Sequence, residues 1–323
     1  MKAIRIDHTG GPETLRVVDI AEPAPSAGEI RIRHNAIGVN FIDTYHRTGL
    51  YPVPLPSGLG LEGAGIVEAV GEGVTRFKIG DRVAYCSGPI GAYAEAHCVA
   101  AERAVKLPDG LGDDIAAASL LKGMTARYLL RKTFRVEPGH VIVIHAAAGG
   151  VGQIAVQWAK HLGAVVIAAV GSDDKAALAR RLGADHAIVS TRENISERVR
   201  AITNGEGADV VYDSVGKDTY ESSLDSLKPT GLLVSYGNAS GPAPDVKPQV
   251  LSAKGSLFFT RPTLFHYVRT TALLDETAQD LFDIIGAGIV SIAAPTVYAL
   301  ADAAQAHRDL EGRRTTGSLV LKP

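Results

Sequence analysis

An apolar run that ends in a glycine-rich turn is the feature that most constrains the fold of this chain. Four consecutive β-favouring residues, 141–144, are typical of a buried parallel strand, and residues 145–152 follow as a turn of small residues. After this turn, apolar residues recur at helical spacing from Val151 to Leu162. The pattern therefore predicts a strand, a glycine turn and a helix in direct succession.

The turn has the spacing of a dinucleotide-binding loop, with alanine in its first position. Ala147, Gly149 and Gly152 stand where this loop has glycines, and small residues let the backbone approach a pyrophosphate at the positive end of the helix. A tight strand–helix turn without a ligand has the same pattern. The residues expected at a pyrophosphate are Gly149, Gly150, Val151 and Gly152.

Composition limits the class of protein. At roughly 150 residues per domain, the 323 residues predict about two domains. The formal net charge of −2, without a dense basic run, disfavours nucleic acid or an anionic membrane as a main partner. Cys86 and Cys98 are too few for a disulfide framework, and we expect both to be small buried residues. The sequence has neither a signal-peptide pattern nor an apolar run of membrane-spanning length, so we expect a cytoplasmic protein.

The first hundred residues alternate with a period of two and predict a β-rich domain. Strands are expected at 2–6, 29–39, 63–70 and 81–84. Between them, residues 40–51 predict a short helix that ends at Gly49. From about residue 113 the period changes, and helices are expected at 113–121 and 125–131.

Strands and helices then alternate, which predicts the α/β class with a doubly wound parallel sheet. The expected strands are 141–145, 165–170, 186–189, 209–212, 232–235 and 257–260. After helices at 275–286 and 301–310, a closing strand at 318–322 is expected to return to the β-rich domain. The second domain is then an insertion, with 1–124 and 261–323 forming one domain and 125–260 the other.

The end of the second strand bears on the choice of coenzyme. An NAD-preferring site has Asp or Glu about 20 residues after the glycine loop, to bind the ribose 2′-hydroxyl. This chain has Gly171 and Ser172 there, which leave room for a 2′-phosphate, and Lys175 can neutralise its charge. We interpret Asp173 and Asp174 as the first residues of the next helix. The pattern predicts NADPH.

Five short motifs, spread along nearly the whole chain, resemble those of a known protein family. They are residues 40–51, 121–125, 145–152, 212–216 and 236–238. Together and in this order, they resemble the quinone oxidoreductase (zeta-crystallin-like) branch of the medium-chain dehydrogenases/reductases. The resemblance implies a GroES-like catalytic domain, a Rossmann domain, NADPH-dependent reduction of quinones and usually a homodimer.

The resemblance also implies further cofactor residues. They are Ser214, Tyr236, Gly237, Asn238 and Arg313. Similar proteins often have a tyrosine where this chain has Thr191, and Arg192 is an alternative contact at that place. For Arg313, a solvated cation at the end of a helix is the other interpretation.

Zinc alcohol dehydrogenases share this architecture, but their zinc ligands have no counterpart here. Asn40, Leu61 and Leu120 or Leu121 stand at the ligand positions that the resemblance implies, and none of these side chains is a usual zinc ligand. We therefore expect no metal.

Four polar residues are candidates for contact with a quinone. Asn40, Tyr45 and Tyr51, together with Thr125, can meet its oxygens, and the aromatic rings suit a flat substrate. We expect positioning to dominate catalysis. Both tyrosines can instead be packing residues. Asp43 and His46 are expected at the surface or at a helix cap.

Two other functions stay open at this point. One is NADPH-dependent reduction of enals or enones. The other is a structural or RNA-binding role in which NADPH is held with little turnover, although the near-neutral charge counts against RNA.

Overall fold

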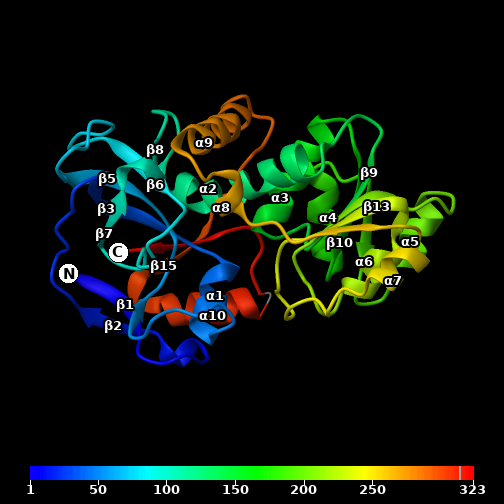
Figure 1. Ribbon diagram of the computed structural model, residues 1–323, viewed down its shortest axis with the longest axis horizontal. Coiled ribbons are helices and arrows are strands. Elements are labelled where there is room, and N and C mark those ends of the chain that lie inside the picture. Colours follow the sequence, from blue (N-terminus) through cyan, green and yellow to red (C-terminus); the bar gives the residue numbers. More distant parts are fainter. Residues whose placement is uncertain (313) are drawn as a thin grey trace. The chain divides into compact units, whose positions relative to one another are not determined.

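The computed structural model describes residues 1–312 and 314–323, and these described residues divide into two compact units (Figure 1). The first unit contains Met1–Lys122, Val268–Gly286 and Ile292–Pro323, and the second contains Gly123–Tyr267 and Ala287–Ser291. The domain boundaries expected from the sequence, between residues 124 and 125 and between residues 260 and 261, stay a prediction.

Antiparallel pairing builds most of the first unit. A small sheet has the order β2-β1-β4, and a larger one has the order β15-β16-β3-β5-β6-β8, with β7 also paired to β3. The strands of the small sheet are β1 (Lys2–Ile6), β2 (Arg16–Asp19) and β4 (Ser57–Gly58). Those of the larger sheet are β3 (Glu29–Val39), β5 (Glu62–Val70), β6 (Arg82–Tyr85), β7 (Ala96–Ala100), β8 (Ala104–Lys106), β15 (Thr296–Ala299) and β16 (Leu319–Lys322).

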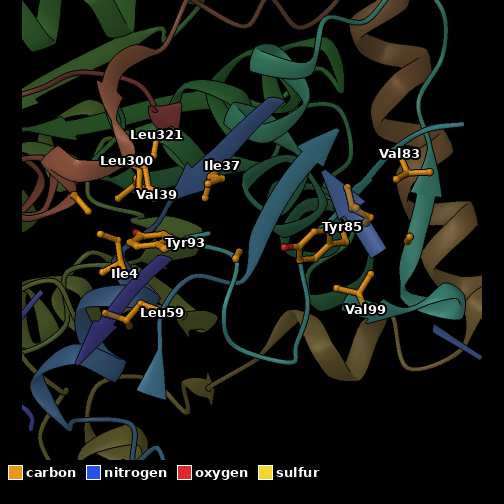
Figure 2. Close-up of a cluster of buried hydrophobic side chains, with 14 of the residues drawn as sticks. Ile4, Ile37, Val39, Leu59, Val83, Tyr85, Tyr93, Val99, Leu300 and Leu321 are labelled. Carbon is orange, nitrogen blue, oxygen red and sulfur yellow. The ribbon is translucent and has the colours of Figure 1, made fainter. Parts of the chain in front are cut away.

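The closing strand returns to this unit, as predicted. β16 pairs antiparallel with β3, so that Leu321 lies opposite Ile37. Both side chains belong to a core cluster in which Val39, Leu300 and Tyr93 are also buried (Figure 2). Burial along β3 alternates over its first half and becomes continuous after a register shift near His34, which places the end of the strand among buried groups.

Several helices and 3-10 turns complete the first unit. Its short helix α1 (Phe41–Thr48) begins after Asn40 and ends at Gly49, whose left-handed φ of 84° suits a residue without Cβ. The others are η1 (Pro12–Thr14), η2 (Ala101–Arg103), α9 (Thr271–Gly286), η4 (Leu300–Asp302) and α10 (Ala303–Glu311). Helix α10 contacts both α1 and η1.

The second unit is the predicted doubly wound α/β fold. Its parallel sheet has the order β11-β10-β9-β12-β13-β14, so the order reverses on either side of β9. The strands are β9 (Val141–His145), β10 (Val165–Val170), β11 (His186–Val189), β12 (Ala208–Asp213), β13 (Leu227–Ser235) and β14 (Phe258–Thr260). The helices are α3 (Gly150–His161), α4 (Asp173–Arg181), α5 (Ile195–Ile202), α6 (Tyr220–Asp225), α7 (Pro248–Ala253) and α8 (Leu264–Tyr267).

One prediction about the helices is wrong. Instead of separate helices at 113–121 and 125–131, a continuous α2 (Asp113–Tyr128) is followed by a π-helical turn, η3 (Leu129–Thr133). A glycine inside a helix costs about 1 kcal/mol relative to alanine. Burial of Leu120 and Met124, both at most 1% exposed, stabilises the helix on either side of Gly123 and offsets that cost.

Among the described residues, no helix combines the length and the apolar character needed to cross a bilayer.

Candidate functional site

The predicted cofactor residues gather at one edge of the parallel sheet. The register places His145 beside Ala169, Tyr212 beside Ile144, and Asp213 beside Ser235. The carboxyl ends of β9, β10, β12 and β13 therefore meet, which is where open α/β sheets bind ligands. The turns and helix starts that follow these strands carry Gly149, Gly150, Val151, Gly152, Gly171, Ser172, Ser214, Tyr236, Gly237 and Asn238.

The glycine loop leaves the start of α3 available to an anion. Gly149 is the N-cap residue of the helix and has no side chain that could bond its first N–H groups. A Cβ on Gly152 would lie 2.4 Å from the carbonyl oxygen of Ala146 and 2.6 Å from Cα of Ala147, so only glycine lets the helix pack on the turn. The amide of Gln153 donates to the carbonyl of Ala148 at 2.9 Å and braces the turn. This geometry fits a pyrophosphate at the helix N-terminus.

The end of β10 has open space at Gly171, and the carboxylate nearby, Asp173, is paired with Arg192. Among the described residues, none would come within 4 Å of a Cβ on Gly171. Ser172 caps α4 by accepting from the N–H of Lys175 at 3.4 Å, and Asp173 is the first residue of that helix, as predicted. Arg192 donates two hydrogen bonds of 2.5 Å to the Asp173 carboxylate, and this lowers the pKa of Asp173. Its guanidinium is therefore engaged with a carboxylate that would otherwise repel a 2′-phosphate.

A buried polar network, which the sequence analysis did not identify, shapes the end of β12. One oxygen of Asp213 accepts from the N–H groups of Val215 and Gly216, at 2.8 and 3.0 Å. The other oxygen accepts from the hydroxyl of Ser223 at 2.8 Å, and this hydroxyl also lies 3.0 Å from Nε2 of His145. The network joins the ends of β9 and β12. An aspartate that ends an apolar strand is the sequence signal that could have revealed it.

The loops after β12 and β13 approach each other closely. A Cβ on Gly237 would lie 2.4 Å from the carbonyl oxygen of Ser214, and the N–H of Tyr236 donates to the carbonyl of Asp213 at 2.7 Å. Only a glycine permits this approach. Ser214, Tyr236 and Gly237 are thereby brought together, whereas Arg313 lies outside the described residues.

In the first unit, two buried acids hold Asn40. Its N–H donates to Oδ2 of Asp43 at 2.8 Å, and its side-chain Nδ2 donates to Oε2 of Glu62 at 2.8 Å. The other oxygen of Glu62 accepts from the N–H of Leu121 at 2.7 Å. Glu62 is fully buried, and burial raises the pKa of its carboxyl. The carboxamide of Asn40, 5% exposed, is therefore fixed in orientation.

Lys122 of α2 lies near the same carboxylate. Its Nζ is 3.6 Å from Oε2 of Glu62, and its side chain is 8% exposed. Among the described residues, Nζ has no hydrogen-bond partner. Neither Glu62 nor Lys122 was predicted from the sequence as a site residue. A lysine inside an otherwise apolar stretch of α2 and a glutamate that begins the apolar strand β5 were the available signals.

Asp43 and His46 were expected at the surface or at a helix cap; both are buried, so the surface part of that prediction is wrong. Asp43 does cap α1, as the alternative expectation held. The hydroxyl of Tyr93 donates to Oδ2 of Asp43 at 2.9 Å, and burial raises the pKa of Asp43 to about 7. Packing of α1 against Tyr93 buries Asp43, and no pattern within the helix predicts such packing.

The hydrogen-bond chain continues from Tyr93 to α10. Nη1 of Arg47 lies 3.0 Å from Nδ1 of His307, and Nε2 of His307 lies 3.0 Å from the hydroxyl of Tyr93. Because arginine only donates, Nδ1 accepts and Nε2 carries the proton. Burial, with Arg47 beside it, lowers the pKa of His307 to about 3, so the ring is neutral. Arg47 also pairs with Glu311 at 2.7 Å. This chain of hydrogen bonds joins α1 to α10.

The two candidate tyrosines lie together. Their rings meet edge to face, with centroids 5.2 Å apart and an interplanar angle of 70°, and the N–H of Tyr51 donates to the carbonyl of Tyr45 at 3.1 Å. Tyr45 is 8% exposed and Tyr51 is half-buried. Asn40 begins the helix that carries Tyr45, so these residues form one group. Thr125 is buried on the part of α2 that belongs to the second unit.

Metal ligands are scarce around the expected positions. Within residues 1–312 and 314–323, no group of three His, Cys, Asp or Glu side chains is arranged to hold a metal ion. Leu61 is buried at 3% exposure. Both cysteines are free, and Cys86 is buried as predicted, whereas Cys98 is only partly buried.

Comparison with known proteins agrees with this description. Residues 26–109 match the alcohol dehydrogenase GroES-like domain, and residues 150–285 match the zinc-binding dehydrogenase family. A quinone oxidoreductase of Pseudomonas aeruginosa is 55% identical over 100% of this chain and 99% of its own. A 2-haloacrylate reductase of Burkholderia sp is 47% identical over 98% of each. The structure of Escherichia coli quinone oxidoreductase complexed with NADPH superposes with a TM-score of 0.98, at 48% identity over 100% of both chains. The chain therefore belongs to the quinone oxidoreductase branch of the medium-chain dehydrogenase/reductase superfamily.

Proposed function

We propose that this protein is an NADPH-dependent quinone reductase that works without zinc. The observation that carries the proposal is the sheet edge at which β9, β10, β12 and β13 end. It combines an uncapped helix start with open space after β10, and it is built from the residues expected for the coenzyme. High identity to quinone oxidoreductases over the whole chain supports the choice of substrate.

The first part of the proposal concerns the coenzyme. The N–H groups at the start of α3 bind the pyrophosphate, and Gly171, Ser172 and Lys175 receive the 2′-phosphate. Arg192 neutralises Asp173, which reduces repulsion of that phosphate. Ser214, Tyr236, Gly237 and Asn238 border the nucleotide along the next strand ends, and Arg313 is proposed as a further contact. When bound, NADPH supplies a hydride.

The second part concerns the acceptor. The edge-to-face rings of Tyr45 and Tyr51 offer apolar surface and hydroxyl groups beside Asn40, and Thr125 of α2 is the fourth candidate. A flat conjugated carbonyl compound such as a quinone fits these groups. Conjugated acids or enones are the second candidate substrates, because a 2-haloacrylate reductase is also a close relative.

A steady-state assay separates these functions. Purified protein is mixed with NADPH and either para-benzoquinone or an enone, and the coenzyme absorbance is followed. We expect rapid oxidation of NADPH with the quinone and slower oxidation with the enone. A reversed order would favour the enone reductase. Tight NADPH binding without turnover of either acceptor would support the structural role.

We further propose that the protein is a cytoplasmic homodimer. β14 ends the strand order of the second sheet, and Phe258 on that strand is 61% exposed. An edge strand with an exposed aromatic side chain is suited to pairing with a second copy. Light scattering should give twice the mass of the chain, and a monomeric mass would contradict the proposal.

A further inference from the structure

The buried side chain of Lys122 has N–H donors that its surroundings do not satisfy. An ammonium group has three N–H donors, and burying it without acceptors is costly. The side chain is 8% exposed, and no acceptor among the described residues lies within hydrogen-bond distance of Nζ. Groups of this kind need a function or a ligand to explain them.

Glu62 does not serve as a full partner. Its two oxygens already accept from Leu121 and from Asn40, at 2.7 and 2.8 Å, and Nζ of Lys122 is 3.6 Å away. The exposed pair of Lys160 and Asp185 closes to 2.5 Å, which is the contact expected of a simple counter-ion.

The backbone of β3 keeps the Glu62 carboxylate in place. A Cβ on Gly38 would lie 2.2 Å from Oε2 of Glu62 and 2.4 Å from the carbonyl oxygen of Ala117, so the carboxylate is held between β3 and α2. Oε2, the oxygen against Gly38, is also the one that lies 3.6 Å from Nζ of Lys122. The amide of Asn40 and the ammonium of Lys122 therefore lie around one oxygen, with N–H donors of Lys122 left over.

We propose that Lys122 is a catalytic residue that donates a hydrogen bond to the carbonyl oxygen of the acceptor, beside Asn40. This inference rests on the proposed reductase function. On hydride transfer the acceptor gains two electrons and one proton, the π pair of its carbonyl moves onto oxygen, and solvent supplies the second proton. The hydrogen bond from the ammonium group stabilises the oxyanion, as fixed donors do in other enzymes.

Lys122→Met tests the proposal. We expect kcat with para-benzoquinone to fall by about a hundredfold or more, the usual loss for one oxyanion donor, while the Kd of NADPH changes less than about twofold. Lys106→Met is the matched control, since Lys106 pairs with Asp81 at 3.3 Å but is 67% exposed. Its kcat should equal that of the wild type.

A double variant separates catalysis from charge balance. Lys122→Met/Glu62→Gln removes both buried charges. Because both oxygens of Glu62 accept hydrogen bonds and a glutamine has only one acceptor oxygen, the single variant Glu62→Gln is the reference. If Lys122 only neutralised Glu62, the double variant would have at least the kcat of Glu62→Gln, and the proposal would be overturned. We expect its kcat to stay at least about tenfold below that of Glu62→Gln, with the NADPH Kd unchanged.

Chemical rescue gives an independent readout. Methylammonium added to Lys122→Ala should raise kcat several-fold, whereas sodium at equal ionic strength should not, and equal effects of both ions would contradict the proposal. A failure of the proposed function looks different, because wild-type protein would then bind NADPH but reduce none of the acceptors.

Discussion

Removing the hydroxyl of Tyr93 tests the buried chain of hydrogen bonds that joins Asp43 to His307 beside the candidate site. This hydroxyl donates to Asp43 at 2.9 Å and lies 3.0 Å from Nε2 of His307. Tyr93→Phe removes this oxygen and leaves the ring in the core, where Tyr93 is fully buried (Figure 2). The variant therefore perturbs the hydrogen bonds and not the packing.

The loss of unfolding free energy in this variant depends on pH, because Asp43 titrates differently in the folded and unfolded protein. Burial raises the folded-state pKa of Asp43 from 3.8 to about 7, so the folded protein binds the extra proton and its stability falls as pH rises between these values. In the wild type this fall amounts to about 4 kcal/mol and ends above pH 7.

The donor hydroxyl of Tyr93 lowers the pKa of Asp43, so its loss moves that pKa further up. Below pH 6 we expect Tyr93→Phe to cost about 1 to 3 kcal/mol, because His307 loses its partner. Above pH 7 the loss should grow by about 1.4 kcal/mol for each further unit of pKa.

Urea unfolding, followed by circular dichroism at pH 6 and at pH 9, measures this effect. Tyr85→Phe is the matched control, since the Tyr85 hydroxyl lies 2.9 Å from Nε2 of buried His34 and no carboxylate hydrogen bond to it is present among the described residues. Its loss of stability should be equal at both pH values. A Tyr93→Phe effect that is also equal at both would refute the reasoning.

Other predictions concern the coenzyme, the acceptor and metals. Lys175→Ala should raise the KM for NADPH by a factor equivalent to about 1.5 to 3 kcal/mol, the range for hydrogen bonds to charged groups. The KM for NADH should stay nearly unchanged. Equal effects on the two KM values would argue against a 2′-phosphate contact. Tyr45→Phe and Tyr51→Phe should each lower kcat/KM less than about tenfold, whereas Tyr51→Ala should cost more by removing the ring that packs on Tyr45. A thousandfold loss in either Phe variant would identify an obligatory proton donor. Dialysis against a strong chelator should leave the rate unaltered, and loss of activity restored by zinc would disprove metal-free catalysis.

The features that sequence predicts well here are local ones. The glycine turn from 145 to 152 and the alternation of strands and helices after it follow from neighbouring residues, and the structure has both. The helix at Asn40 and its end at Gly49 follow for the same reason, since caps and left-handed glycines act within one turn. The return of the closing strand required only that a final alternating segment find a β-rich partner.

The features that sequence missed depend on contacts between distant residues. Asp43 was expected at the surface or at a helix cap, and the cap is visible locally, whereas Tyr93, whose hydroxyl donates to the buried carboxylate, comes from another part of the chain. The pairing of Glu62 with Lys122 has no local signature either. The short strands β2 and β8 were missed because their pairing partners, rather than their own period, define them.

The central claim is that this chain uses the sheet edge for NADPH and passes its reducing equivalents to a quinone. It is tested most directly by kcat/KM for NADPH and for NADH, each measured with para-benzoquinone in metal-free buffer. The account predicts efficient reduction with NADPH and a preference over NADH of at least about tenfold, the equivalent of one charged phosphate contact. Equal values for the two coenzymes, or no reduction of the quinone, would contradict it.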